Sequence, residues 1–248
     1  FVNDRFDVKY LKKDNGGKHT ALNTGVKIIS EELTFVVDSD DMLTNDAVAI
    51  IVNDWMRLKE MDRIVGLSYY RLDNLGKVIG MEYPKDNTLD TYANMRVNKA
   101  VTGDKAEVYL TKILREYPFP VFEGERFLSE AIVWNRISKD NWKLMFIGKG
   151  IYVCDYLEGG LTKLGRKYRL QNPLGTMEHA RAHFIKEIKY SIKIKYMLLY
   201  TAMRLFSQKT IKEACEALDN YKILYYVMLI PGFILSRFWK VKYFGRGF

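Results

Sequence analysis

The chain has 248 residues, of which 48% are hydrophobic and 28% are charged. This composition excludes a disordered tail and a collagen-like fibre, and the length accommodates one domain with an appendage or two small domains. The two cysteines, Cys154 and Cys215, are too few and too far apart for a disulfide scaffold or a zinc cluster. Two free thiols fit a reducing compartment.

The net charge of +9 is confined to the last part of the chain. Residues 180–248 contain 13 Lys or Arg and 4 Asp or Glu, whereas the residues before them contain 26 of each sign. The sequence therefore predicts a neutral body with a basic extension, and basic extensions attract nucleic acid or anionic membrane surfaces.

Strands and helices are expected to alternate through the first 154 residues. The patterns predict helices at 18–29, 46–60 and 127–138, and a polar loop or short helix at 86–104. They predict strands at 8–11, 33–37, 63–70, 76–81, 107–110, 144–147 and 151–154, with a hairpin joining 63–70 to 76–81. Strands mixed with helices indicate a layered α/β domain.

From residue 177 onward the pattern is helical only. It predicts one long helix at 177–206 and a shorter one at 209–219. His179 and His183 share a helix face, but Ala180 replaces the glutamate of HExxH, so we expect the pair to pack rather than bind metal. Residues 223–236 are apolar but only 14 long and broken by Pro231 and Gly232, which favours an interfacial or re-entrant segment over a spanning helix.

The strongest local signal is the run from Asp38 to Asp41, which follows the apolar strand LTFVV. Acids at the carboxyl end of such a strand lie where open α/β sheets bind ligands. Asp38 and Asp40 are separated by one residue and can approach one hard cation, Mg²⁺ or Mn²⁺, which prefers oxygen ligands and substrate phosphates. The alternative is that these acids only cap the next helix.

Two further segments contain candidate site residues. Asn15-Gly16-Gly17-Lys18-His19 lacks the GxxxxGK[ST] pattern, but a glycine turn that opens a helix can face a phosphate. In the second segment, residues 122–131, Glu123, Glu125 and Glu130 are candidate general bases, since burial would raise a carboxyl pKa. The alternatives are an ordinary turn with a solvated lysine and a charged helix start.

In order and approximate spacing, NGGKHTALNTG, FVVDSDDML and FPVFEGERFLSEAIVWNRI resemble the motifs of family 2 glycosyltransferases, in particular bacterial enzymes of capsular, exopolysaccharide or cell-wall glycan synthesis. The resemblance covers about residues 8–170. It implies a GT-A-like mixed sheet, a catalytic domain over 1–176 and a helical extension over 177–248. The family's first strands have no counterpart, so the domain is expected to lack them.

The resemblance also implies roles for individual residues. It places Asn15, Gly17, Lys18, Asn23, Asp38 and Asp40 at the nucleotide-diphosphate sugar donor, with Asp40 as the main ligand of Mn²⁺ or Mg²⁺ and Asp38 supporting the metal or the ribose. Arg126 stands where the family often has the aspartate base. The base is therefore expected to be Glu125 first and Glu130 second, in an inverting transfer to a glycan or lipid-linked acceptor.

Two other functions remain open at this point. The Asp38–Asp40 pair also fits a haloacid-dehalogenase-like phosphatase, although Met42 replaces the Thr or Val of that motif and no later strand ends in paired acids. A non-catalytic membrane-surface module is the other alternative. Because the basic residues lie beside apolar helix stripes, we expect an anionic membrane surface as partner and no nucleic acid. The expected location is the cytoplasm, peripheral at the inner face of the cell membrane.

Overall fold

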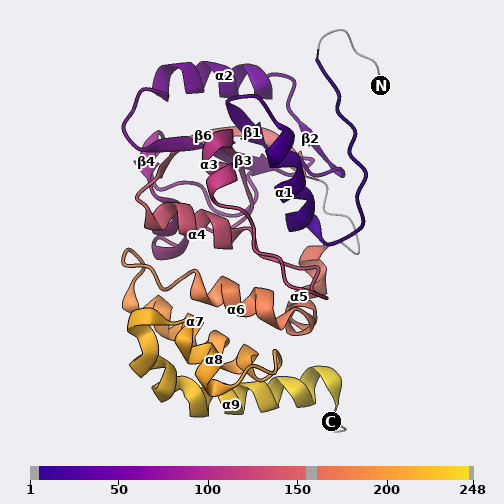
Figure 1. Cartoon of the computed structure of the whole chain (residues 1–248). Coiled ribbons are helices and arrows are strands. Elements are labelled where there is room, and N and C mark those ends of the chain that lie inside the picture. Colours follow the sequence, from indigo (N-terminus) through magenta and orange to yellow (C-terminus); the bar gives the residue numbers. More distant parts are fainter. Residues whose placement is uncertain (1–5, 155–160, 246–248) are drawn as a thin grey trace.

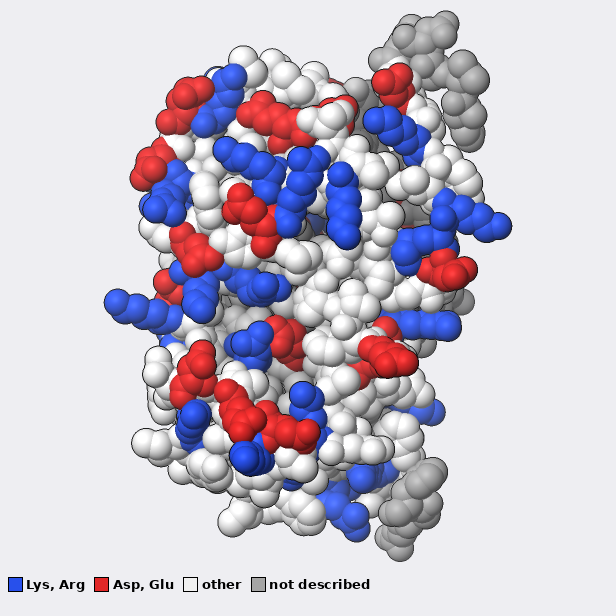
Figure 2. Space-filling view, in the orientation of Figure 1, with Lys and Arg blue, Asp and Glu red and all other residues white. Residues whose placement is uncertain are grey.

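The computed structural model describes residues 6–154 and 161–245. Figure 1 shows an α/β part that contains the sheet and, on one side of it, a layer of helices that contains α5 to α9. Over the face visible in Figure 2, acidic and basic side chains are interspersed on the α/β part.

The helices of the α/β part are α1 (Lys18–Ile28), α2 (Ala47–Leu58), α3 (Thr111–Glu116), α4 (Ala131–Lys139) and a π-helical turn, η1 (Ala93–Asn98). The helical layer consists of α5 (Leu161–Gln171), α6 (Pro173–Arg181), α7 (Tyr190–Arg204), α8 (Ile211–Glu216), a 3-10 turn, η2 (Asp219–Tyr221), and α9 (Lys222–Phe244). The strands are β1 (Leu33–Phe35), β2 (Asp41–Leu43), β3 (Ile64–Leu72), β4 (Thr88–Asp90), β5 (Lys105–Leu110) and β6 (Lys143–Cys154).

The sheet is mixed, with the order β1-β5-β3-β6-β2, and β4 also pairs with β6. Among the strand pairs of the described residues, only β3 and β6 run parallel to each other. Most residues of β3 are buried, as expected for a strand with covered faces. The acidic turn, residues 38–41, connects the end of β1 to the start of β2. The strand order places this turn at the same end of the sheet as the end of β3.

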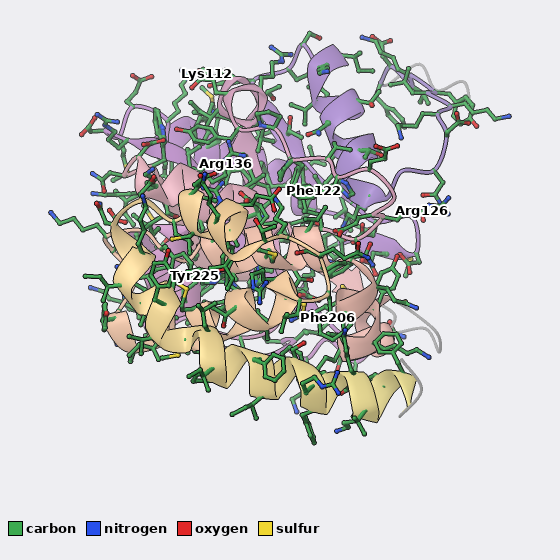
Figure 3. The ribbon with its side chains drawn as sticks, turned by 60° about the horizontal axis from the view of Figure 1, so that its bottom comes forward. Lys112, Phe122, Arg126, Arg136, Phe206 and Tyr225 are labelled. Atoms are coloured by element: carbon green, nitrogen blue, oxygen red, sulfur yellow. The ribbon has the colours of Figure 1, made fainter. Side chains whose placement is uncertain are left out.

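The two parts have separate apolar cores. The core of the α/β part contains Leu67 and Phe146 from the sheet, Trp55 from α2 and Ile132 from α4. The core of the helical layer includes Tyr225 from α9, with Phe206 packed at its margin (Figure 3).

Several predicted elements are wrong in extent. Residues 8–11 are exposed and outside any strand, and 144–147 and 151–154 belong to one continuous strand, β6. The predicted strand at 33–37 is shorter, since β1 ends at Phe35. The predicted hairpin is reduced to one bridge between Leu72 and Val78, flanked by backbone hydrogen bonds from Asp73 to the carbonyl of Lys77 and from Ile79 to the carbonyl of Arg71.

The single helix predicted over 177–206 is divided into α6 and α7. The Asn98 side chain donates to the carbonyl of Glu187 at 2.7 Å and accepts the N–H of Lys189 at 3.0 Å. These bonds satisfy backbone groups that a continuous helix would have paired internally, and α7 starts immediately afterwards at Tyr190.

The apolar segment predicted to break at Pro231 and Gly232 is instead part of the continuous helix α9. Gly232 packs so closely on Thr201 of α7 that an added Cβ would overlap the threonine side chain. Within the described residues, Asp219–Phe244 is the one helical stretch whose length and composition suffice to cross a membrane, and 28% of its apolar window is buried against the protein. The helix is longer than the 14-residue apolar run at 223–236, because it continues on both sides of that run.

Candidate active site

The three motifs singled out in the sequence converge on one ammonium group. The Nζ atom of Lys18, the first residue of α1, lies 2.6 Å from Oδ1 of Asp38 and 2.9 Å from Oε1 of Glu130. Partial burial lowers the pKa of Lys18, but the charges and hydrogen bonds of Glu130 and Asp38 outweigh it and the net shift is upward. The turn after β1, the start of α1 and the residue before α4 therefore form one charged site.

The glycine turn before Lys18 lies against residues 122–131, which we call the acidic segment. Gly17 has φ +90°, and an added Cβ would overlap the carbonyl oxygen of Arg126. The Asn15 side chain accepts the N–H of Gly17 at 3.0 Å, which fixes the turn. A residue with a side chain cannot occupy position 17 without displacing the backbone of the acidic segment.

Arg71 and Tyr152 extend the site on the sheet side. Arg71, near the end of β3, places one guanidinium nitrogen 3.7 Å from Asp38 and 3.4 Å from Asp41. Tyr152 on β6 accepts the N–H of Asp38 at 2.9 Å and donates to Asp41 at 2.8 Å. The Arg71 guanidinium also lies over the Tyr152 ring, 4.0 Å from its centre. No motif or periodicity identified Arg71 or Tyr152, because their roles depend on strand pairing.

Asp40 differs from its two neighbours. Its side chain is exposed, and in 6–154 and 161–245 it has no hydrogen-bond or ion-pair partner. Across those same ranges no group of three His, Cys, Asp or Glu side chains is close enough to hold a metal ion. Asp40 thus offers one free carboxylate, and a Mg²⁺ or Mn²⁺ ion bound there would need phosphate oxygens and water for its remaining ligands, which is the usual arrangement for Mg²⁺.

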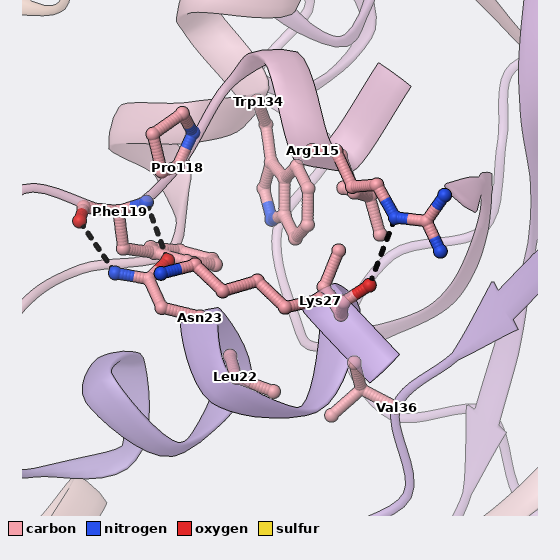
Figure 4. Close-up of a pocket in the computed structure, with 10 residues that line it drawn as sticks. Leu22, Asn23, Lys27, Val36, Arg115, Pro118, Phe119 and Trp134 are labelled. Carbon is pink, nitrogen blue, oxygen red and sulfur yellow. Dashed lines mark hydrogen bonds between the residues drawn. The ribbon is translucent and has the colours of Figure 1, made fainter. Parts of the chain in front are cut away.

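Asn23 connects α1 to the segment that precedes Phe122. Its side-chain amide donates to the carbonyl of Phe119 at 2.8 Å and accepts the N–H of Phe119 at 2.9 Å, which joins α1 to the Pro118–Pro120 segment (Figure 4). Asn23 also lines a cavity of about 170 Å³ whose other walls are mostly apolar, including Leu22, Val26 and Trp134.

Among the described residues Glu125 makes no ion pair with Lys18, and it instead holds the first turn of α6. Its two carboxylate oxygens accept the N–H groups of Leu174 at 2.6 Å and Gly175 at 2.7 Å. Burial raises the pKa of Glu125, partly offset by these two hydrogen bonds. A carboxylate at a helix N-terminus is stabilised by the unpaired N–H groups and the helix dipole. Of the two expected bases, only Glu130 reaches the Lys18–Asp38 pair.

Glu107 is a carboxyl group that sequence reasoning missed. It lies on β5, and burial raises its pKa to about 7 although the charges of Arg96 and Arg71 lower it. The charge of Glu130 adds to the upward shift, so Glu107 and Glu130 belong to the same electrostatic environment. The sequence feature that could have pointed to Glu107 is a glutamate in the otherwise apolar strand segment EVYL. A glutamate at any half-exposed strand position gives the same pattern.

Comparisons with known proteins give structural matches only. No model of a known protein family matches the chain, and no curated protein matches it by sequence. Residues 1–349 of S. aureus TarS in complex with UDP-GlcNAc superpose with a TM-score of 0.58 at 12% identity, over 97% of this chain and 76% of that chain.

Two further TarS structures agree with this match. TarS 1–349 on its own gives a TM-score of 0.54 at 11% identity, over 94% of this chain and 73% of that one. A longer TarS structure gives 0.55 at 12% identity, over 92% of this chain and 43% of that one. The expected mixed α/β fold is therefore confirmed: this chain has the GT-A fold of TarS.

Proposed function

We propose that the chain is a glycosyltransferase that moves a sugar from a nucleotide-diphosphate donor to a hydroxyl group of a glycan or lipid-linked acceptor. The observation that carries the proposal is the Lys18 ammonium group, which joins Asp38 of the acidic turn to Glu130. The fold adds support, since the TarS structure that it matches contains the nucleotide sugar UDP-GlcNAc.

Glu130 is the general base in this proposal. A single displacement that inverts the anomeric carbon needs one carboxylate, which takes the acceptor proton while the hydroxyl oxygen attacks and the nucleoside diphosphate leaves. Glu130 is half-buried, and its carboxylate pairs with the Lys18 ammonium group that also contacts Asp38. Glu125 is less suited, because the N-terminus of α6 occupies both of its oxygens.

The donor diphosphate would lie near Lys18 and the acidic turn. Asp40 would hold Mn²⁺ or Mg²⁺ together with diphosphate oxygens, and the ion would neutralise charge on the leaving group. Asp38 would position the ribose or support the metal, and Lys18 and Arg71 hold its carboxylate in place. Asn15 and Gly17 would shape the turn that faces the phosphates, with Asn23 bracing the helix behind it.

The test is a panel of nucleotide sugars, UDP-GlcNAc included, incubated with the chain and Mn²⁺ while released nucleoside diphosphate is measured. We expect release from at least one donor, reduced about 10²–10⁴-fold by Glu130→Gln. Glu60→Gln is the matched control, because Glu60 is exposed and lies just before the start of β3, whereas Arg71 lies near the end of that strand. Lack of binding and turnover with every donor would overturn the proposal.

The same samples test the phosphatase alternative. That reaction would release inorganic phosphate from a generic phosphate ester and form an aspartyl-phosphate on Asp38. We expect neither, and phosphate release abolished by Asp38→Asn would replace the transferase proposal with the phosphatase one.

A further inference from the structure

The outer face of α9 is an apolar stripe that no part of the described chain covers. Its side chains recur every three or four residues along the helix, and the most exposed are Ile223 at 83% and Ile230 at 74%. At 1.5 Å per residue, the 23 residues of α9 span about 34 Å. We call this surface the α9 stripe; it consists of Ile223, Tyr226, Val227, Ile230, Phe233, Ile234, Phe238, Val241 and Phe244.

The opposite face of α9 is buried against the rest of the helical layer. Tyr225 and Trp239 are buried in the core of the helical layer, and Ser236 is buried on the same face. Close packing of Gly232 on Thr201 fixes α9 against α7. Figure 3 shows Tyr225 inside the layer and the outer side chains of α9 directed away from the molecule. A helix held in this way can lie on a membrane but cannot cross one without leaving its core.

The charges of α9 are all positive. Lys222 is at its first turn, and Arg237, Lys240 and Lys242 are near its C-terminal end, whereas the helix contains no Asp or Glu. In Figure 2 the lower edge of the molecule, where α9 lies, is white and blue. An apolar stripe with basic residues at both ends is typical of helices that bind anionic lipid headgroups.

This charge pattern argues against a second copy of the chain as the occupant. A two-fold interface places the same patch on both partners. The stretch Asp219–Phe244 contains four basic residues and one acid, Asp219, so two α9 stripes facing each other would bring an excess of positive charge together.

We propose that the α9 stripe docks on an anionic membrane surface, with α9 parallel to the surface and its apolar side chains at the boundary between headgroups and acyl chains. Basic residues at the two ends contact the lipid phosphates, and the neutral α/β part stays in water. The inference goes beyond the proposed function and does not depend on it, because it concerns lipid binding without donor or acceptor.

Vesicle flotation of the full chain tests this proposal. We expect at least about tenfold more bound protein with vesicles of phosphatidylcholine and phosphatidylglycerol than with phosphatidylcholine alone, and less binding as salt screens the charges. The paired change Ile230→Glu and Ile234→Glu should lower the bound fraction about tenfold, since both side chains are exposed and would carry charge into the apolar boundary.

The matched control is Val48→Glu with Val52→Glu on α2, at the far side of the α/β part from α9 (Figure 1). This pair adds the same charge at similarly exposed apolar positions, and we expect it to float like the original chain. Circular dichroism and light scattering of every variant report folding and oligomeric state.

Three outcomes would overturn the proposal: equal flotation of the α9 and α2 pairs, equal binding to both vesicle compositions, or a lipid-free dimer that the α9 pair dissociates while no variant floats. The last outcome would assign the stripe to a second copy.

Discussion

The carboxylate of Glu125 accepts the N–H of Gly175 at 2.7 Å, so the acidic segment of the α/β part holds the first turn of α6 in the helical layer. Asn172 makes a parallel connection, since its side-chain oxygen accepts the N–H groups of Arg126 and Phe127. The residues between Phe122 and Glu130 are therefore anchored to the helical layer at one end and to Lys18 at the other.

This arrangement separates the effects of two isosteric changes. Glu125→Gln should lower the free energy of unfolding by about 1–2 kcal/mol, because it removes a charge that two N–H groups and the helix dipole stabilise. Glu130→Gln should instead lower turnover about 10²–10⁴-fold with a smaller effect on stability. Urea unfolding and donor turnover of both variants check this, and a Glu125 variant that is stable but inactive would reverse the assignment of the base.

Two glycines of the α1 region should respond in opposite directions. Gly17→Ala should destabilise the chain by about 2 kcal/mol or more, because φ is +90° and the new methyl group would overlap the Arg126 carbonyl. Gly25→Ala should stabilise it by about 0.5–1 kcal/mol, since Gly25 lies within α1 with open space around it. Thermal unfolding of both variants measures the difference. Equal changes in stability would contradict the close approach of Gly17 to the Arg126 carbonyl.

The buried histidine pair should make stability fall in mild acid. His183 donates from Nδ1 to the carbonyl of His179 at 2.8 Å and stacks on Tyr196, and burial lowers its pKa from 6.5 to about 4. Below pH 6.5 the unfolded chain binds a proton that the folded chain does not, so stability is lost as the pH falls from about 6.5 to 4.

Burial also lowers the pKa of His179 and acts in the same direction. His183→Gln should flatten the slope of unfolding free energy against pH in that window, whatever its effect at pH 7. Denaturant unfolding at several pH values measures the slope, and an unchanged slope would show that His183 does not titrate as described.

The metal proposal predicts a change confined to one residue. Asp40→Asn should remove the Mn²⁺-dependent increase in donor affinity while the melting temperature stays the same, because the Asp40 side chain is exposed and has no hydrogen bond or ion pair with a described residue. Asp62→Asn, also exposed, is the control. Calorimetric titration of a nucleotide sugar with and without Mn²⁺ measures the effect; a persisting metal dependence in the Asp40 variant would reject it as the ligand.

Sequence reasoning identified the fold class because local patterns and motif order suffice for it. Helix α1 begins at Lys18 and β5 ends at Leu110, as expected, and the mixed sheet has the predicted class. The split between α6 and α7 was not predictable, because it depends on Asn98, which is distant in sequence.

The same limit applies to the site. The motifs that contain Lys18, Asp38 and Glu130 were recognisable, but their contacts depend on how α1, β1 and α4 meet. The position of Glu125 under α6 depends on the helical layer, whose packing no local pattern encodes. Arg71 and Tyr152 join the site through strand register, which was unknown before the structure.

Pro231 inside α9 has a consequence for how deeply this helix can sit in lipid. Proline lacks an N–H group, so the carbonyl of Val227, one turn earlier, loses its usual intrahelical donor. Val227 lies on the exposed side of the helix, where water is the available replacement. An unhydrated carbonyl is costly in the hydrocarbon interior. The proline therefore limits how deep α9 can lie in the bilayer. The Val227 carbonyl stays hydrated only where the bilayer still contains water, among the headgroups.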